Sequence, residues 1–149
     1  MDFPPPPLRL RRRIEFSQTD AAGLAHFSTF FFFMEAAEAE LFRGLDLPLL
    51  QEGPEGATGF PRGDVQCRFR RPLAFGDLVE TRLTMGEVTA RRLHYDFLFL
   101  NEAGKRVATG TMTTVFARRE RGGNLAADDL PSAWRERLQQ WIDAAKGKG

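Results

Sequence analysis

A run of four phenylalanines, Phe30 to Phe33, opens a predicted helix and limits the folds open to this chain. Ser28 or Thr29 can cap this helix, which is expected to run from about Phe30 to Arg43 and to stop at Gly44. A helix whose first turn is apolar on every side must be enclosed by other elements. We therefore expect a sheet to wrap the opening turns. The later turns are amphipathic and are expected to reach the surface, with their acids on the wetter side: Glu35, Glu38 and Glu40.

Alternating apolar residues predict five strands around that helix. Residues 8–16 form the first strand, and residues 17–27 form the loop that leads to the helix. Glycines and prolines mark residues 45–64 as a loop and a candidate lid. Four strand signals follow, over residues 65–70, 79–85, 93–100 and 107–115. A single helix enclosed by a long antiparallel sheet is the simplest assembly of these parts, which makes the fold class α+β.

The two ends of the chain carry simpler signals. Residues 1–7 are a Pro-rich lead-in, and residues 130–146 predict an amphipathic C-terminal helix with Pro131 at its first helical position. One face of that helix must pack on this sheet or on a neighbouring subunit: Trp134, Leu138, Trp141, Ile142 and Ala145. The length of 149 residues predicts one domain over residues 1–149.

Composition excludes several classes of protein. A net charge of +1 and the lack of a long basic tract argue against a nucleic-acid partner. No segment has the length of a membrane span, so no membrane partner is expected. Cys67 is the one cysteine, which rules out an intrachain disulfide and fits a cytoplasmic protein. With two histidines and that single cysteine, a metal site is not expected.

Asp20 is the strongest candidate for chemistry because it lies among small and apolar residues just before the helix. Gly23 allows a tight backbone turn after it, and His26 follows six positions later. The first N–H groups of a helix lack internal partners and lie at the positive end of its dipole, so they polarise a carbonyl group. A carboxylate beside them can act as a general base or as a nucleophile. These are the parts that acyl transfer to water requires.

Structural interpretations of the same residues stay open. Aspartate is common in turns, so Asp20 alone can be a turn or capping residue. His26, beside a hydrophobic helix, can be a hydrogen-bonded packing residue. The sequence contains neither G-x-S-x-G nor an evident Ser-His-Asp or Cys-His set, which removes the usual serine and cysteine nucleophiles.

Two motifs together resemble the hotdog-fold acyl-CoA thioesterases of the 4-hydroxybenzoyl-CoA thioesterase type. Residues 16–27 match that family's aromatic-x-x-T/C-D-x-x-G stretch before its central helix. Residues 70–77 match its R-P-L-x-F-G-D turn. The resemblance runs from about Arg9 to Ala117. It implies a hotdog fold, with an antiparallel sheet wrapped around a central helix, here extended by the C-terminal helix.

The resemblance implies hydrolysis of an acyl-CoA or aroyl-CoA thioester to the free acid and CoA. In that reaction Asp20 would attack the carbonyl or activate water, the backbone N–H of Phe27 would polarise the thioester oxygen, and Gly23 would shape the loop. His26 would line the acyl pocket or orient the thioester. Some relatives carry a histidine one position later, which argues against a general-acid role for His26. Another branch uses a helix glutamate, so Glu35 is a secondary candidate, with a solvated helix acid as its alternative.

The resemblance also implies substrate contacts and partners. Phe30 belongs to an apolar acyl pocket or to an ordinary core. Arg91 and Arg92 would contact the phosphates of CoA, with Arg118 and Arg119 as weaker candidates and solvated strand ends as the alternative for all four. No metal or redox cofactor is implied. Such subunits pair by extending one sheet, which predicts a homodimer or homotetramer whose second subunit completes each pocket.

Two other functions are compatible with the sequence. Hydratases and dehydratases of acyl thioesters on this fold use an acid and a histidine a few residues apart, as Asp20 and His26 are, although their G-D-x-N-P-h-H pattern is absent. A non-catalytic acyl-CoA-binding module is the other alternative, and the intact Asp20 and Gly23 argue against it.

Overall fold

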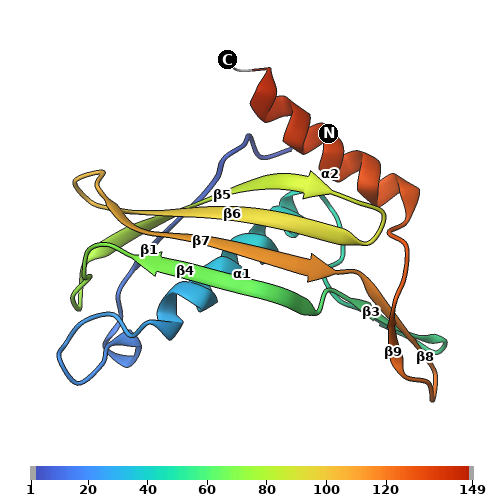
Figure 1. Cartoon of the computed structure of the whole chain (residues 1–149), viewed down its shortest axis with the longest axis horizontal. Coiled ribbons are helices and arrows are strands. Elements are labelled where there is room, and N and C mark those ends of the chain that lie inside the picture. Colours follow the sequence, from blue (N-terminus) through green and yellow to red (C-terminus); the bar gives the residue numbers. More distant parts are fainter. Residues whose placement is uncertain (1–2, 148–149) are drawn as a thin grey trace.

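The computed structural model describes residues 3–147, which form a five-stranded antiparallel sheet curved around one long helix (Figure 1). The strand order is β1-β5-β6-β7-β4. The elements are α1 (Ser28–Gly44), β1 (Leu8–Arg13), β4 (Arg62–Phe69), β5 (Leu78–Val88), β6 (Arg92–Asn101) and β7 (Arg106–Val115). The predicted α+β arrangement is therefore confirmed. Residues 1–2 of the lead-in and residues 148–149 of the expected domain lie outside the described residues.

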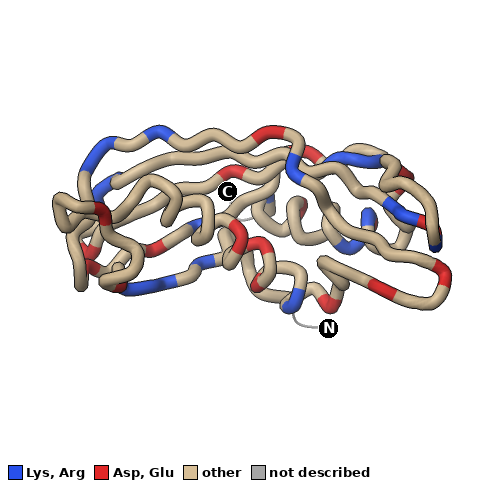
Figure 2. Tube along the Cα trace, turned by 90° about the horizontal axis from the view of Figure 1, so that it is seen from below, with Lys and Arg blue, Asp and Glu red and all other residues tan. Residues whose placement is uncertain are grey.

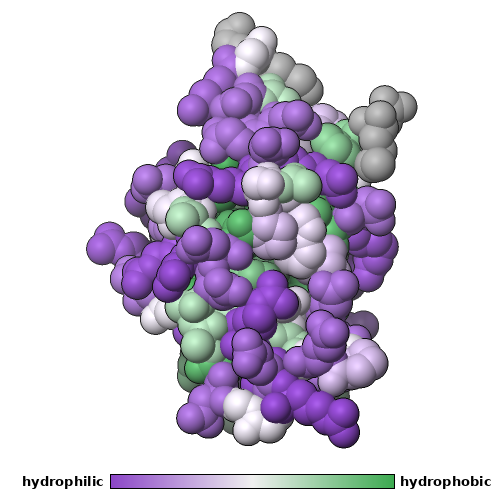
Figure 3. Space-filling model, turned by 90° about the vertical axis from the view of Figure 1, so that its right-hand side faces the viewer, coloured by the Kyte–Doolittle hydropathy of each residue, from purple (hydrophilic) through white to green (hydrophobic). Residues whose placement is uncertain are grey.

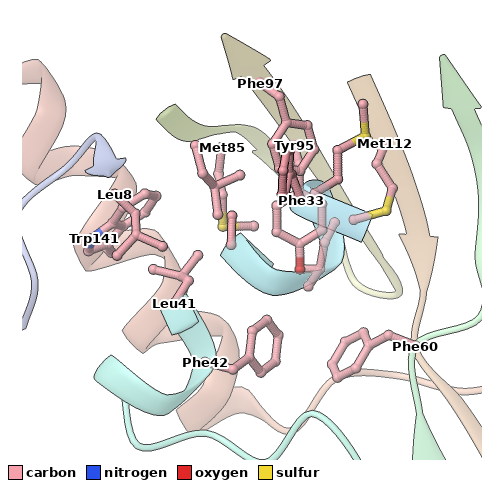
Figure 4. Close-up of a cluster of buried hydrophobic side chains, with 14 of the residues drawn as sticks. Leu8, Phe33, Leu41, Phe42, Phe60, Met85, Tyr95, Phe97, Met112 and Trp141 are labelled. Atoms are coloured by element: carbon pink, nitrogen blue, oxygen red, sulfur yellow. The ribbon is translucent and has the colours of Figure 1, made fainter. Parts of the chain in front are cut away.

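The core lies between α1 and the concave face of the sheet. Along β6, the residues that face the helix are buried and alternate with more exposed ones at the predicted period of two: Leu93, Tyr95, Phe97 and Phe99. Figure 4 shows buried side chains from several elements packed around the helix, with Phe42 opposite Phe60 and Leu8 beside Trp141. The ring centroids of Phe42 and Phe60 are 5.1 Å apart and lie edge to face, an arrangement that aromatic pairs prefer.

The burial along α1 differs in part from the expectation. Phe30 and Phe33 are buried, but Phe32 is 65% exposed, so the first turn is not enclosed on every side. The later turns, expected at the surface, are buried at four positions: Ala37, Glu38, Leu41 and Phe42. The reason is that the second half of the helix is also covered by the C-terminal helix and by the segment that contains Phe60.

A second, smaller sheet occupies one end of the molecule. Its order is β2-β3-β8-β9, from β2 (Gln51–Gly53), β3 (Gly56–Gly59), β8 (Ala117–Glu120) and β9 (Leu125–Ala127). The prediction of a loop over residues 45–64 is therefore wrong in part. Strands of three or four residues rich in glycine carry too little alternation to be detected. Gly56 is required here, because its φ is +142° and a Cβ would collide with the backbone of Arg119.

The C-terminal helix α2 (Ser132–Lys146) packs on this chain's own sheet. Pro131 is its N-cap residue, with extended ψ of 136°, and not its first helical residue as expected. Three of the five predicted face residues are buried: Leu138, Trp141 and Ile142. Arg137 donates from Nη1 to the carbonyl oxygens of Leu45 and Asp46, each at 3.0 Å, which satisfies acceptors left free where α1 ends.

Charges are interspersed along the described chain (Figure 2), in keeping with the small net charge. Among residues 3–147, no helix is both long enough and apolar enough to cross a membrane.

A charged group of α1 lies inside the core. Glu38, expected on the wet side of α1, has no exposed surface. Its Oε1 lies 2.8 Å from Nη2 of Arg62 at the start of β4, and the Tyr95 hydroxyl is buried next to it. Burial holds the pKa of Glu38 above its ordinary value, with Arg62 and Tyr95 opposing that shift. The ion pair therefore joins the central helix to an edge strand of the sheet.

Replacing Arg62 by alanine should lower the free energy of unfolding by about 3 kcal/mol at pH 7, because Glu38 is left charged and unpaired in the core. The folded protein protonates Glu38 at a higher pH than the unfolded chain does, so this loss should shrink as the pH falls through the folded-state pKa. Urea denaturation across pH measures both effects. Arg68→Ala is the control, since Arg68 is exposed on the same strand. Equal losses in the two variants would contradict the role of the ion pair.

Candidate active site

The loop that carries Asp20 is fastened to the turn before β5. The Ala25 N–H donates to the Leu73 carbonyl at 2.6 Å, and the Phe75 N–H donates to the Gly23 carbonyl at 3.3 Å. The turn itself is shaped by Asp77, whose Oδ2 accepts the N–H of Ala74 at 2.8 Å. The two sequence motifs, about fifty positions apart, therefore form one structural unit at the end of the sheet where α1 begins (Figure 1).

Within this loop the Asp20 carboxylate is oriented by the backbone. Its Oδ1 accepts the N–H groups of Ala22 at 2.9 Å and of Leu24 at 3.1 Å. Oδ2 has no hydrogen-bond partner among residues 3–147. Gly23 has φ of +79°, as the sequence suggested, so that the chain can turn back on itself. The apolar neighbours do not bury Asp20, which is exposed in the single chain.

The start of α1 presents an unpaired donor. The helix begins at Ser28, with Phe27 as its N-cap residue, so the expected caps Ser28 and Thr29 lie inside the first turn. The Phe27 N–H has no partner among the described residues, whereas the Ser28 N–H donates to Nδ1 of His26 at 3.2 Å. The Thr29 hydroxyl donates to the Gln18 carbonyl at 3.0 Å, which fixes the helix start against the loop. A free N–H is thus held at the positive end of the helix dipole.

The other expected site residues are distributed unevenly. Phe30 lies beneath the helix start and is buried between the rings of Phe69 and Phe99, with centroids at 5.2 and 5.1 Å. Glu35 lies further along α1, where it is exposed and its Oε1 is 3.6 Å from Nη2 of Arg62. Asp20, Gly23, His26 and Phe27 are the members that the fold brings together.

The expected CoA-binding arginines lie at the far end of the same chain. Arg92 is the first residue of β6, and the last residues of β6 pair with the start of β5 beside the Asp20 loop. The length of β6 therefore separates Arg92 from Asp20 by about 30 Å. Arg91 donates a hydrogen bond from Nε to Oδ1 of Asp129 at 2.7 Å, and Arg118 donates one from Nε to Oδ2 of Asp128 at 2.9 Å. One chain by itself therefore does not bring these arginines to Asp20.

The surface around Asp20 is unusually apolar, which the sequence did not indicate. Of the eight large hydrophobic residues exposed in the described chain, six lie around this loop and helix start: Phe16, Leu24, Phe27, Phe32, Phe69 and Phe75. A cluster of this kind marks a binding or association surface. Its signal in the sequence is that Phe16, Leu24 and Phe27 lie within the first motif, whereas Phe75 lies within the second and Phe69 beside it.

Comparison with known proteins decides the family. Residues 14–142 match the sequence profile described as the thioesterase-like superfamily. The chain belongs to the thioesterase-like superfamily. This membership confirms the resemblance inferred from the two motifs and makes the chain a thioester hydrolase by class.

Individual proteins similar to this chain agree with this assignment. A 1,4-dihydroxy-2-naphthoyl-CoA hydrolase from Thermosynechococcus vestitus is 30% identical over 105 residues, which cover 70% of this chain and 72% of that protein. The structure of a gentisyl-coenzyme A thioesterase is 25% identical, with a TM-score of 0.71 over 85% of this chain and 98% of that one. A 1,4-dihydroxy-2-naphthoyl-CoA thioesterase from Synechocystis, 18% identical, shares the fold with a TM-score of 0.75 over 89% and 95% of the two chains. The hotdog fold is thereby confirmed.

Substituting Gly23 by alanine should cost about 1 kcal/mol of stability, because a residue with a side chain is strained at positive φ. No neighbour lies within 4 Å of the position that a Cβ would take, so backbone strain is the sole cause. Thermal unfolding measures the loss. Gly53→Ala is the matched control, since Gly53 has equally open surroundings and no positive φ. Unfolding temperatures that fall equally in both variants would contradict this explanation.

Proposed function

We propose that this chain hydrolyses an aroyl-CoA or acyl-CoA thioester to the free acid and CoA, with Asp20 and the Phe27 N–H as its reacting groups. The observation that supports this most directly is the pairing of the two at one place. A loop fixes one carboxylate oxygen and leaves the other free, and the adjoining helix start offers an N–H that no other residue uses.

The reaction follows from these groups. The thioester oxygen accepts the Phe27 N–H, which draws electron density from the carbonyl carbon. Asp20 then either adds to that carbon through its free oxygen or removes a proton from a water molecule that adds instead. The tetrahedral oxyanion is stabilised by the Phe27 N–H and by the helix dipole, and it collapses with departure of the CoA thiolate. If Asp20 itself has added, a water molecule then hydrolyses the resulting mixed anhydride, which releases the free acid and restores the Asp20 carboxylate. The reaction uses only the substrate, water and the protein's own groups.

The comparisons favour an aromatic acyl group. The hydrolase from Thermosynechococcus vestitus and the gentisyl-coenzyme A thioesterase are both named for aromatic substrates. The exposed rings around Asp20 can stack on such a group, since aromatic pairs gain stability beyond the area they bury. An aliphatic acyl chain would gain only the burial of its apolar surface.

The proposed site is built from two copies of the chain. β4 lies at an edge of the large sheet and pairs only with β7 among the described strands. The opposite edge, β1, carries four arginines in six residues, which discourages further pairing, whereas β4 carries two arginines and one aspartate in eight residues. β4 therefore pairs antiparallel with β4 of a second copy. This pairing also covers the apolar surface around Asp20.

Antiparallel pairing brings opposite ends of the two copies together. The Arg62 end of β4 in the partner then lies against the Phe69 end in the first copy, which is the Asp20 end. The small sheet is joined to that Arg62 end, and a groove of about 410 Å³ beside it is lined by Leu50 and Leu125, the other two exposed hydrophobic residues, and by Arg119. Figure 3 shows apolar surface framed by hydrophilic side chains on this end. Arg91, Arg92 and Arg118 of the partner subunit thereby approach Asp20.

Asp20→Asn should reduce kcat by about 100- to 10,000-fold while the unfolding temperature stays the same. Asparagine keeps an oxygen that accepts the Ala22 and Leu24 N–H groups, so the loop is retained and only the charge is lost. Release of free thiol from a panel of aromatic and aliphatic acyl-CoAs measures the activity. Crotonyl-CoA absorbance in parallel reports hydration. A wild type that releases no thiol from any member of the panel would refute the proposal.

Mixing Asp20→Asn with Arg118→Gln chains, refolded together, tests the two-copy site. Each mixed dimer then combines one intact Asp20 with one intact Arg118 of the partner subunit. Random pairing of the two chains makes half of the dimers mixed, and each mixed dimer has one complete site out of two. The activity of the mixture should therefore rise above that of either variant alone, to about a quarter of the wild-type value. Sedimentation velocity first establishes that the wild type is dimeric or tetrameric. A monomeric wild type, or a mixture no more active than its parents, would contradict the arrangement.

A further inference from the structure

Ser28, the first residue of α1, favours one tautomer of the His26 imidazole. Its Nδ1 lies 3.2 Å from the backbone nitrogen of Ser28 and 2.7 Å from the Ser28 hydroxyl oxygen. A backbone N–H can only donate, so Nδ1 is the acceptor and carries no proton. The neutral ring therefore has its hydrogen on Nε2.

The main chain fixes the position of this ring next to the proposed oxyanion donor. The His26 N–H donates to the Gln18 carbonyl at 2.8 Å, and the His26 carbonyl accepts the Thr29 N–H at 2.9 Å. The ring lies against that of Phe27, with centroids 4.5 Å apart. Nε2 has no hydrogen-bond partner among residues 3–147. The free N–H of the ring and the free backbone N–H thus belong to consecutive residues.

We propose that His26 acts on the thioester as a neutral hydrogen-bond donor through Nε2–H, and that Ser28 is the positioning residue that fixes its tautomer. This inference rests on the proposed thioester hydrolysis. A tetrahedral oxyanion can accept more than one hydrogen bond, and Nε2–H supplies the second beside the Phe27 N–H. No proton leaves the ring: the C–S bond breaks with the electron pair on sulfur, and CoA departs as the thiolate.

This role differs from that of a general acid, and two substitutions separate the roles. Glutamine at position 26 places an amide N–H₂ near the site of Nε2, whereas asparagine places its amide near the site of Nδ1. A donor at the Nε2 position therefore survives in His26→Gln and is lost in His26→Asn. His26→Asn should lose about 100- to 1,000-fold in kcat, the usual effect of removing one oxyanion donor. His26→Gln should remain at least about tenfold more active than His26→Asn, with the same dependence of kcat on pH as the wild type.

The tautomer is measured independently of activity. The chain has two histidines, so the ¹⁵N spectrum of the wild type contains two imidazoles, and His94→Gln assigns that of His26. We expect a protonated Nε2 and an unprotonated Nδ1 for His26 at neutral pH. Ser28→Asp keeps the backbone N–H but replaces the hydroxyl beside Nδ1 by a carboxylate, which accepts a hydrogen from that nitrogen and competes with the N–H, so the proton should shift toward Nδ1. It should also lower kcat without an equal change in KM.

Three results would overturn the inference: a proton on Nδ1 in the wild type, full activity in His26→Asn, or equal loss in His26→Gln and His26→Asn. Thermal unfolding of each variant removes any effect of misfolding, because only folded variants are compared. Failure of the proposed thioester hydrolysis gives a different result from failure of this inference. In that case the wild type releases no thiol, whereas failure of this inference alone leaves the wild type active and Asp20→Asn impaired.

Discussion

The backbone hydrogen bonds between the Asp20 loop and the turn over residues 72–77 are the interaction on which the rest of the site depends. They join the start of α1 to the start of β5, and the bond from the Thr29 hydroxyl to the Gln18 carbonyl holds the helix N-terminus against the loop that carries the carboxylate. Asp77 and Gly76 shape the turn, and Asp20 and Gly23 shape the loop, each through an aspartate that accepts backbone N–H groups beside a glycine at positive φ. Pre-organisation of this kind lowers the reorganisation needed when charge develops on the substrate.

The remainder of the fold keeps that unit in place. α1 is anchored at its far end by Arg137 of α2 and along its length by the buried pair of Glu38 and Arg62. A buried ion pair contributes little net stability compared with apolar residues of similar size. It is nevertheless costly to break on one side only, which ties the position of the helix to the edge strand β4. β4 is also the strand proposed to pair with β4 of a second copy. The ion pair therefore connects the central helix to the proposed dimer interface.

The exposed hydrophobic residues of the single chain form two separate surfaces. Six lie around Asp20, and the other two line the groove by the small sheet at the opposite end of β4. The proposed antiparallel pairing of two β4 strands brings these two surfaces together. The arginines expected to bind CoA lie about 30 Å from Asp20 within one chain, and in the proposed dimer those of the partner subunit approach it instead.

The sequence by itself determined the helix, the five long strands and the loop with Asp20 and Gly23, because periodicity and turn residues are local properties of the chain. It could not reveal the burial of Glu38, since that depends on Arg62 arriving from β4, nor the short strands β2, β3, β8 and β9, which exist only by pairing with one another. Only the tertiary structure showed which phenylalanines are exposed and that Ser28 fixes the His26 ring. These properties depend on distances between segments, which composition and spacing do not encode.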